Sequence, residues 1–458
     1  MRGSSRIAPK ITLVISSLFH ARSALESRLV ETLEKRFEVV VVCTEEVFEI
    51  YRQTLEQRAC YFFQIDGSAE NFSNRVMNAG AFRFKSRSSS FRYRIKRRIR
   101  ESARFRTSQD SISINFPAVL SWGVIWFKLF IDGWILYRTY LVPRYRKILD
   151  ANSSLVEIFK VVKPDAVVIW SQSMEPASSS AVRSARQLNI PSILIADNWD
   201  NLFSKTVLVE KPDLVGCFGM QSAYFGARLH GIPLENVVPL GSARFEIYRE
   251  PEKIYGQRDT VLYVGSSIVA EDERVLRTLL KVKNDLEGAE SLDATLIWKY
   301  RPHPFPQKSD LDMEGVLKEF TGLQVEKIND PDEGATSWPK LSDSVAELSR
   351  TCIAVCMPTS YLLEVRINSI EVIVPAFEDN SEVTSCNTLL SSLEHLKGLS
   401  SLSGVTIARS EVEIESRLRE KISAPNFPPP DQTLDWFVQW SGEGFGQNLM
   451  NAVSRVLK

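Results

Sequence analysis

Three potential cations stand close together in the string WKYRPHPFP (298–306): Lys299, Arg301 and His303. The string follows the apolar run ATLIW, which predicts a strand, and open α/β sheets bind ligands at the carboxyl ends of their strands. Pro302 and Pro304 keep the residues before them out of helical conformations. Cationic groups held in this way predict a site for a phosphate or diphosphate. The alternative is a surface loop with an incidental histidine.

Two further strings have the pattern of phosphate-binding turns. In CMPTSYLLEV (356–365) a strand leads into a helix whose predicted N-cap is Thr359 or Ser360, so free backbone N–H groups are expected to bind an anion there. Glu364 lies too far along to cap this helix and is predicted to accept hydrogen bonds from ribose hydroxyls. An ordinary capped helix is the alternative. A third turn, VGSS, ends an earlier predicted strand and contributes two candidates: Gly265 and Ser266.

Candidate proton-transfer groups follow strands in the first half of the chain. The string DNWDNLFSK (197–205) comes directly after the apolar run SILIA and contains Asp197 and Asp200. A carboxylate in this place can act as a general base towards a hydroxyl group. His20, which follows the first predicted strand, is the other candidate base. Asp and Asn also simply favour turns, which is the alternative for each of these residues.

Patterns for several other chemistries are missing. The sequence has no Walker A loop, no GxGxxG after the first strand, no GxSxG and no HExxH, and its six cysteines include no CxxC pair. Two D-x-D strings, Asp310/Asp312 and Asp330/Asp332, fall in polar connecting segments and are not predicted to be metal sites. We therefore expect no metal and no other cofactor, with the cations at 299–303 neutralising a departing diphosphate.

Strand-length apolar runs alternate with helical patterns along most of the 458 residues, which is typical of parallel α/β units. The first two strands, ITLVIS and EVVVVC, are joined by a predicted helix over 23–37 that a Ser23–Glu26 capping box would start. The pattern predicts three parts: a Rossmann-like domain over 1–250, a second Rossmann-like domain over 251–430, and C-terminal helices over 431–458 that pack back on the first domain.

An insertion over about 80–142 breaks this α/β rhythm. Eleven basic residues and one acidic residue lie between Arg83 and Arg106, and a Trp- and Phe-rich stretch follows over 116–142. Lys128 and Asp132 interrupt this stretch, which argues against a transmembrane helix. We expect a segment that binds an anionic membrane surface, and the alternatives are a solvated basic face with a buried helix, or RNA binding. The expected interface residues are Arg97, Arg98, Trp122, Trp126 and Trp134.

The overall charge and the N-terminus limit the location and the partners. The 56 Lys and Arg balance the 56 Asp and Glu, which argues against a general nucleic-acid-binding protein. The N-terminal sequence has the pattern of a first strand and not of a secretory leader with a cleavage site. We therefore expect a cytoplasmic protein that can associate with the inner face of the cytoplasmic membrane.

The strings DNWDNLFSK, PDLVGCFGMQSAYFGARLHGIPLENVVPLGSARFEIY (212–248), RPHP and PTSYLLEV, in this order, resemble bacterial GT-B glycosyltransferase-like proteins of surface-polysaccharide biosynthesis. The likeness covers about 160–380 and extends more distantly to the CDP-glycerol glycerophosphotransferases. PTSY stands where those enzymes usually carry a Ser/Asp-rich phosphate motif, which lowers the polyol-phosphate option. The insertion has no counterpart that we can place in this family.

The resemblance implies two Rossmann-like domains that face a cleft, with the acceptor on the first domain and a nucleotide-sugar donor on the second. His303 and Arg301 would contact the donor phosphates, Thr359 and Ser360 would bind phosphate, and Glu364 would bind ribose. The acceptor would enter near Asp197 and Asp200. The implied activity is transfer of a sugar from a nucleotide-activated donor to a cell-surface glycan or a lipid-linked acceptor. The alternatives are a CDP-glycerol type transferase, a UDP-sugar epimerase, or a non-catalytic scaffold that binds membrane or glycan.

Overall fold

The computed structural model describes two compact units, each with its own sheet. Unit 1 comprises Met1–Glu246 with Trp436–Lys458, and unit 2 comprises Ile247–Asp435. The structure describes the residues 8–64, 68–97, 124, 126–151, 154–171, 175–205, 207–249, 258–266, 269–288, 296–303, 313–326, 340–377 and 385–458.

The sheet of unit 1 is parallel throughout and has the strand order β3-β2-β1-β4-β5-β6-β7. Its strands are β1 (Lys10–Ile15), β2 (Glu38–Cys43), β3 (Cys60–Phe62), β4 (Ala166–Ser171), β5 (Ser192–Ala196), β6 (Leu214–Cys217) and β7 (Val237–Pro239). Leu13 of β1 pairs with Val41 of β2 on one side and with Val168 of β4 on the other. The chain therefore changes direction across the sheet between β1 and β4, which is the topological switch point of this unit.

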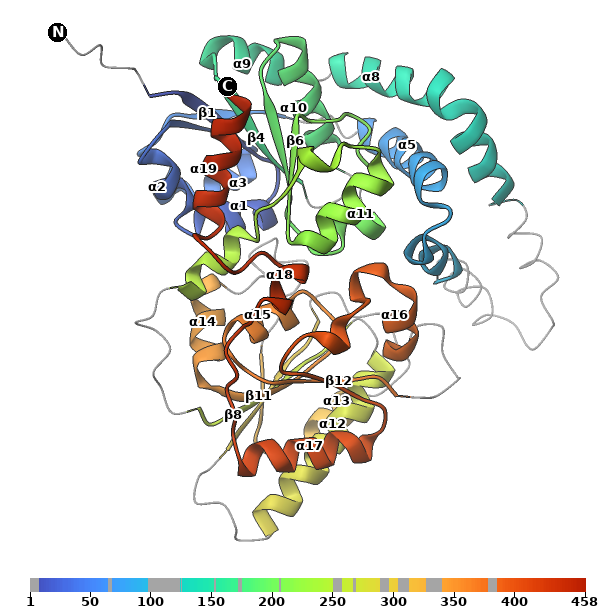
Figure 1. The fold of residues 1–458 in the computed structure, drawn as a ribbon, viewed down its shortest axis with the longest axis vertical. Helices are drawn as coiled ribbons and strands as arrows, with labels where there is room; N and C mark the ends of the chain where they lie inside the picture. The colour runs from blue at the N-terminus through green and yellow to red at the C-terminus, as the bar shows by residue number, and fades with distance from the viewer. Residues whose placement is uncertain are drawn as a thin grey trace. The chain divides into compact units, whose positions relative to one another are not determined.

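Helices cover both faces of this sheet because alternate strand residues point to opposite sides (Figure 1). Leu13 and Ile15 belong to a core with residues of α1, α2 and α19, whereas Val14 belongs to a core with residues of α9, α10 and α11. The helices of this sheet are α1 (Leu18–Leu25), α2 (Leu29–Glu34), α3 (Glu45–Ile50), α4 (Arg52–Leu55), α9 (Leu155–Val162), α10 (Pro176–Gln187), α11 (Met220–His230), α19 (Phe445–Val456) and the short η2 (Asn201–Lys205) and η3 (Leu234–Asn236). The short helix η4 (Ala243–Arg249) spans the boundary between the units.

The helix predicted over 23–37 is wrong in its start and its continuity. The first helix, α1, begins at Leu18, and the Ser17 hydroxyl caps it by accepting a bond from the His20 backbone N–H. Ser23 therefore lies inside α1 and starts no helix. Arg28 adopts a left-handed conformation with φ of 57°, which ends the first helix and allows α2 to begin at Leu29.

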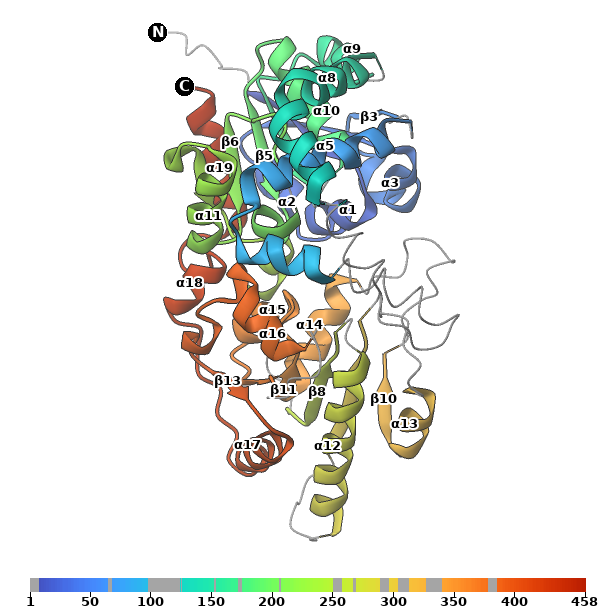
Figure 2. The same cartoon turned by 90° about the vertical axis from the view of Figure 1, so that its right-hand side faces the viewer.

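The described part of the insertion is helical. Helix α5 (Ser68–Lys85) packs beside a long helix that consists of the π-helical η1 (Ile131–Leu141) and α8 (Val142–Ala151), as Figure 2 shows. Trp126 packs its ring against Phe82, Trp134 is exposed and Arg97 is half-buried. Two other predicted interface residues, Arg98 and Trp122, lie outside the described residues. Within the described ranges, no helix has the length and apolar character needed to cross a membrane.

Unit 2 contains a second parallel sheet with the order β10-β9-β8-β11-β12-β13. Its strands are β8 (Thr260–Val264), β9 (Ile297–Arg301), β10 (Leu323–Val325), β11 (Thr351–Cys356), β12 (Val372–Pro375) and β13 (Val405–Ala408). Its helices are α12 (Val269–Gly288), α13 (Met313–Glu319), α14 (Leu341–Arg350), α15 (Tyr361–Ile367), α16 (Cys386–Ser392), α17 (Glu411–Ser423), η8 (Glu394–Leu396) and η9 (Leu399–Ser401), and α18 (Thr433–Phe437) spans the boundary between the units. Here the switch point lies between β8 and β11.

Candidate functional site

Ionisable side chains gather at the switch point of unit 1. His20 follows β1, Glu175 follows β4, and Asp197 is the residue directly after β5. These three strands are neighbours in the sheet, so their carboxyl ends bring the three side chains to one edge. This edge at the switch point is where open parallel sheets bind ligands.

His20 and Glu175 are linked through a serine. The Ser16 hydroxyl donates a hydrogen bond of 3.1 Å to Glu175 Oε2 and lies 3.2 Å from His20 Nδ1, while the imidazole and the carboxylate are 3.8 Å apart. Burial lowers the pKa of His20 to about 3, so its imidazole is neutral at physiological pH. Burial also raises the pKa of Glu175 to about 7; the Ser16 bond opposes this rise and the charge of Asp197 adds to it.

Asp197 is buried, and its pKa lies closer to neutral pH than that of an ordinary aspartate. Burial raises its pKa to about 6, although the Arg244 guanidinium, a hydrogen bond from Ser23 and the charge of Arg22 partly offset this effect. No described residue forms a hydrogen bond with its Oδ2 atom. Its backbone N–H donates a 3.1 Å bond to Ser171 O, which fixes the turn after β5 against β4.

The arrangement can exchange protons with a bound substrate. The carboxyl groups of Asp197 and Glu175 have pKa values of about 6 and 7 and interact electrostatically. At neutral pH one of them can therefore be ionised while the other is protonated. Such groups are efficient general bases and acids because their pKa values lie close to the working pH. The neutral His20 ring, held beside Ser16, positions the Glu175 carboxyl and does not carry charge itself.

The structure brings together two of the three predicted catalytic residues and adds one that sequence reasoning missed. Asp197 and His20 both neighbour Glu175, which the sequence analysis did not single out. Its signal was its position directly before Pro176, the first residue of a helix that follows a buried strand. Asp200 is used in the local turn instead, because its Oδ2 accepts a 3.1 Å bond from the Ser204 hydroxyl.

In unit 2 two of the three predicted cations, Lys299 and Arg301, lie on the strand β9 and not in a loop after it. Strand β9 continues to Arg301, three residues beyond the predicted end, so Lys299 and Arg301 point to the same face of the sheet. Both cations form ion pairs with Glu347 of α14, and Arg301 Nη1 lies 2.8 Å from Glu347 Oε2. Arg301 also lies 3.3 Å from a carboxylate oxygen of Glu326.

The charges of this cluster balance one another. Burial alone would lower the pKa of Arg301, but the Tyr361 phenol and the nearby carboxylates outweigh burial and raise it. Burial alone would raise the pKa of Glu347, but Arg301 and Lys299 outweigh burial and lower it. A phosphate group would therefore compete with Glu347 and Glu326 for these cations. Sequence reasoning missed both glutamates because they come from other parts of the unit: Glu347 lies on α14, and Glu326 directly follows β10.

The other residues predicted to bind the nucleotide-sugar donor lie at the same sheet edge, and they differ in burial and in their hydrogen bonds. His303 is half-buried two residues after β9. Ser360 is the N-cap of α15, but its side chain makes no capping bond, and Thr359 donates its backbone N–H to Met357 O within the turn. Glu364 already has a partner within unit 2, because its Oε2 accepts a 2.7 Å bond from the Tyr248 hydroxyl.

The turn after β8 already binds a carboxylate of the protein. The Ser266 backbone N–H donates to Asp272 Oδ1 at 3.2 Å, and the hydroxyls of Tyr263 and Tyr300 donate to the same carboxylate. Burial raises the pKa of Asp272 to about 6. A Cβ atom on Gly265 would lie 2.6 Å from Asp272 Oδ2, so the absence of a side chain is what lets the turn close over this acid.

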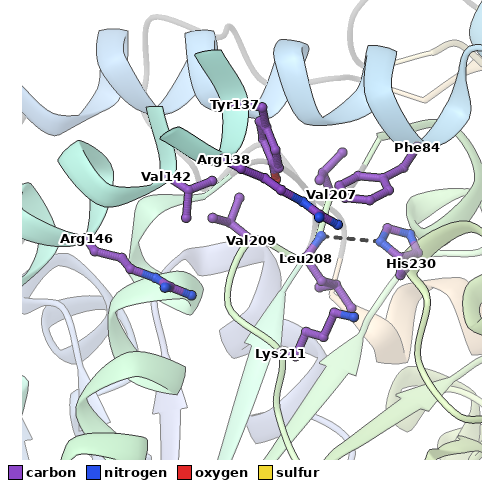
Figure 3. Close-up of a pocket in the computed structure, with 10 residues that line it drawn as sticks. All are labelled: Phe84, Tyr137, Arg138, Val142, Arg146, Val207, Leu208, Val209, Lys211 and His230. Atoms are coloured by element: carbon purple, nitrogen blue, oxygen red, sulfur yellow. Dashed lines mark hydrogen bonds between the residues drawn. The ribbon is translucent and has the colours of Figure 1, made fainter. Parts of the chain in front are cut away.

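A cavity of about 250 Å³ lies elsewhere in unit 1, beside α5 and the η1–α8 helix (Figure 3). It is lined by Phe84, Tyr137, Arg138, Val142, Arg146, Val207, Leu208, Val209, Lys211 and His230, none of which the sequence analysis singled out. Burial lowers the pKa of His230 well below its ordinary value, so the ring is neutral, and its Nδ1 accepts a bond from the Leu208 N–H.

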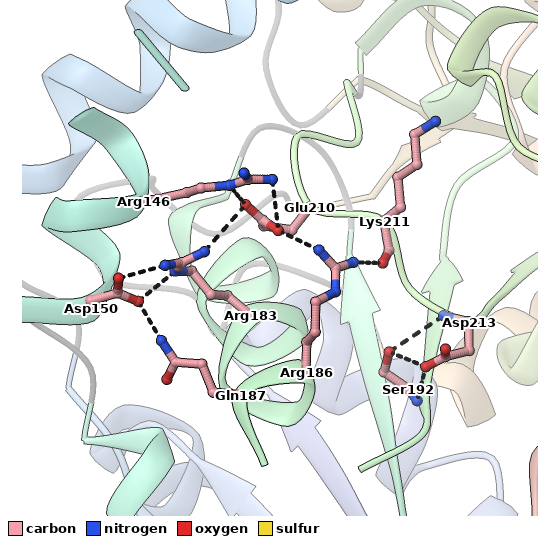
Figure 4. Close-up of polar contacts among 9 residues, drawn as sticks. All are labelled: Arg146, Asp150, Arg183, Arg186, Gln187, Ser192, Glu210, Lys211 and Asp213. Atoms are coloured by element: carbon pink, nitrogen blue, oxygen red, sulfur yellow. Dashed lines mark hydrogen bonds and ion pairs between the residues drawn. The ribbon is translucent and has the colours of Figure 1, made fainter. Parts of the chain in front are cut away.

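An ion-pair network next to this cavity fixes the position of Arg146, one of the residues that line it. Figure 4 shows the fully buried Glu210 carboxylate between three arginines: Arg146, Arg183 and Arg186. Lys211 donates a 2.7 Å bond to Gly231 O. Because most of the cavity's charges are satisfied in this way, we assign it no part in the chemistry described above.

Comparison with solved structures shows the fold. The chain matches the structure of MnaA with UDP from S. aureus with a TM-score of 0.52 and 12% identity, covering 98% of this chain and 97% of that chain. It matches UDP-GlcNAc 2-epimerase from Methanocaldococcus jannaschii with a TM-score of 0.53 and 10% identity over 97% and 99% of the chains. It matches the UDP-N-acetylglucosamine 2-epimerase from Rickettsia bellii with a TM-score of 0.51 and 9% identity over 98% of both chains.

These likenesses and the two parallel sheets confirm the predicted GT-B-like α/β fold class. No protein-family model and no curated protein matches the chain.

Proposed function

We propose that the protein is an enzyme acting on a nucleotide-activated sugar, and that it transfers the sugar to a cell-surface glycan or a lipid-linked acceptor. The observation that carries this proposal is the pair of carboxyl groups, Glu175 and Asp197, poised for proton transfer at the switch point of unit 1. The likeness of the fold to a structure solved with UDP and to enzymes named as UDP-GlcNAc 2-epimerases supports the choice of substrate class.

In this proposal unit 1 carries the acid–base groups. The ionised member of the Glu175–Asp197 pair accepts the proton of the acceptor hydroxyl as its oxygen bonds to the sugar carbon. The bond between that carbon and the diphosphate breaks in the same step, and the diphosphate leaves with the electron pair. His20 acts as a positioning residue because it contacts Ser16 and lies beside Glu175.

Unit 2 is proposed to hold the nucleotide at its own switch point. Lys299, Arg301 and His303 would neutralise the departing diphosphate without a metal, and Thr359 and Ser360 would bind phosphate through the turn after β11. The diphosphate would displace Glu347 from the two cations of β9, or Glu326 from Arg301. Glu364 would accept hydrogen bonds from ribose in addition to the one that its Oε2 accepts from the Tyr248 hydroxyl.

The second candidate function is epimerisation of a UDP-sugar. The specific observation in its favour is that the solved structures from M. jannaschii and R. bellii are both named as UDP-GlcNAc 2-epimerases. Inversion of a carbon centre requires removal and return of a proton, and an acid–base pair such as Glu175 with Asp197 suits that task as well.

The test is to incubate the full chain with UDP-GlcNAc, UDP-glucose and UDP-galactose in D₂O and to follow each reaction by NMR. Transfer to an added acceptor, or slowly to water, releases UDP, whereas epimerisation changes the sugar while UDP remains attached and deuterium enters the carbon. We expect UDP release that persists in a metal chelator and is lost in Glu175→Gln. The matched control is Glu157→Gln, whose side chain is 74% exposed on α9. If none of the three UDP-sugars is changed and no nucleoside diphosphate binds, the non-catalytic scaffold replaces our proposal.

A further inference from the structure

The long helix of the insertion, which begins with the helical residues 126–130 and continues as η1 and α8, leaves large apolar side chains on the surface. Their exposed fractions are 66% for Phe127, 49% for Phe130, 54% for Trp134, 56% for Ile135 and 43% for Tyr140. Single exposed apolar residues are common in soluble proteins, but a series on one helix marks a surface that contacts something apolar.

The other side of the same helix is already used by the fold. Gly133, Tyr137, Leu141, Tyr145 and Leu149, spaced by four residues, are buried. Gly133 lies so close to α5 that a Cβ atom there would be 2.9 Å from Ala79 O. Asp132 also turns inward and forms a 2.7 Å ion pair with Arg75. The buried side of the helix therefore packs it against the rest of unit 1.

Cations accompany the exposed rings. Arg83 of α5 lies 5.2 Å from the centre of the Trp134 ring and 5.9 Å from that of Phe84, which is itself 39% exposed. Arg144 of α8 lies 5.9 Å from the ring of Tyr140 and 5.7 Å from that of Phe72 in α5. Each arginine thus connects aromatic rings of α5 and η1 at the surface.

The exposed charges of this helix are positive. Lys128, Arg144 and Lys147 are exposed, and among the described residues no carboxylate forms an ion pair with them. Both acidic residues of the described segment are neutralised, Asp132 by Arg75 and Asp150 by Arg183. The surface formed by the five exposed apolar residues and these cations is called the aromatic–basic face below.

We propose that the aromatic–basic face docks on an anionic phospholipid membrane. Aromatic rings favour the boundary between headgroups and acyl chains, and exposed Lys and Arg are attracted to anionic headgroups. A second copy of the chain fits less well, because a symmetric contact would place the same cations opposite one another. The proposal goes beyond the proposed chemistry and does not depend on it, since it concerns a different part of unit 1.

The test is co-sedimentation of the full chain with vesicles of phosphatidylcholine alone or mixed with phosphatidylglycerol. We expect binding to the mixed vesicles that weakens as salt is added, and little binding to phosphatidylcholine alone. The double variant Trp134→Ser, Ile135→Ser should weaken the partition at least about tenfold. Lys128→Gln and Arg144→Gln should each weaken it about fivefold.

The matched controls are Val161→Ser, which alters a 67% exposed side chain on α9, and Lys35→Gln, which removes an exposed cation next to α2. Neither control should change the partition. Circular dichroism and melting of every variant exclude unfolding as the cause of a loss. Three outcomes overturn the proposal. The first is no binding of the wild type to mixed vesicles, and the second is that the double variant Trp134→Ser, Ile135→Ser binds them as well as the wild type does. The third is a self-association that these substitutions abolish while vesicle binding persists.

Discussion

Replacing Glu175 by Gln is expected to stabilise the protein while it removes activity. Burial raises the pKa of Glu175 from 4.5 to about 7, and one pKa unit corresponds to about 1.4 kcal/mol, so the ionised carboxylate costs the fold about 3 kcal/mol. Gln has no charge, keeps an oxygen that can accept the Ser16 hydrogen bond, and occupies a site whose side chain is 24% exposed to water.

The stabilisation by Glu175→Gln is expected to increase with pH. Below about pH 4 the carboxyl group is protonated in both the folded and the unfolded chain, so Gln should change the free energy of unfolding little. Between pH 4.5 and about 7 the unfolded chain ionises before the folded chain does, and wild-type stability falls as pH rises. Above that window the full advantage of Glu175→Gln should be present.

Calorimetric melting near neutral and acidic pH, together with the UDP-sugar assay, measures both effects. At about pH 8 the Tm of unit 1 should rise by roughly 5 °C in Glu175→Gln, and at about pH 4 it should be almost unchanged. Glu157→Gln, on the exposed side of α9, should show neither effect. Equal stability of Glu175→Gln and wild type at both pH values would refute the reasoning, because it would mean that the buried carboxylate costs nothing.

Three further substitutions test other parts of the account. Asp197→Asn should lower kcat about a hundredfold or more, whereas Asp200→Asn should lower it far less because the Asp200 carboxylate belongs to a local turn. Similar losses in both variants would contradict the assignment of proton transfer to Asp197. Glu347→Gln should cost about 3–5 kcal/mol in urea unfolding because it leaves two cations of β9 without their buried partner, and an unchanged midpoint would show that the network is not a stabilising one. Gly265→Ala should cost about 1–3 kcal/mol, because the new Cβ would meet Asp272 Oδ2 at 2.6 Å; a neutral effect would mean that this turn can shift freely.

The fold class could be predicted from the sequence because its signals are local. Buried parallel strands such as TVLYV, which forms β8, are continuous apolar runs, and helical patterns separate them along the chain. The end of β9 was harder to place, because Lys299 and Arg301 are polar residues that alternate with the buried Trp298 and Tyr300. The prolines after this strand restrict Arg301 to extended backbone, which fits a strand as well as a loop.

The partners of the site residues could not be predicted, because tertiary contacts set them. Glu347 lies 46 residues after Arg301, and no local pattern links the two. Glu175 looks like an ordinary residue before a helix until β1 and β4 become neighbours in the sheet. Asp272 is close to Ser266 in sequence, but Tyr300, which also donates to its carboxylate, belongs to the neighbouring strand β9. The sequence therefore identified candidate groups but not the charges that surround them.

Binding of nucleotides to the full chain tests the central claim, that the protein acts on a nucleotide-activated sugar, most directly. UDP, GDP, CDP and CMP are each added at increasing concentration, and the melting temperature is recorded. A ligand at about 100 times its Kd stabilises a protein by about 2.7 kcal/mol, which is easily detected. The account predicts a saturable rise for at least one nucleoside diphosphate and a smaller rise for CMP, and it is contradicted if none of the diphosphates changes the melting temperature.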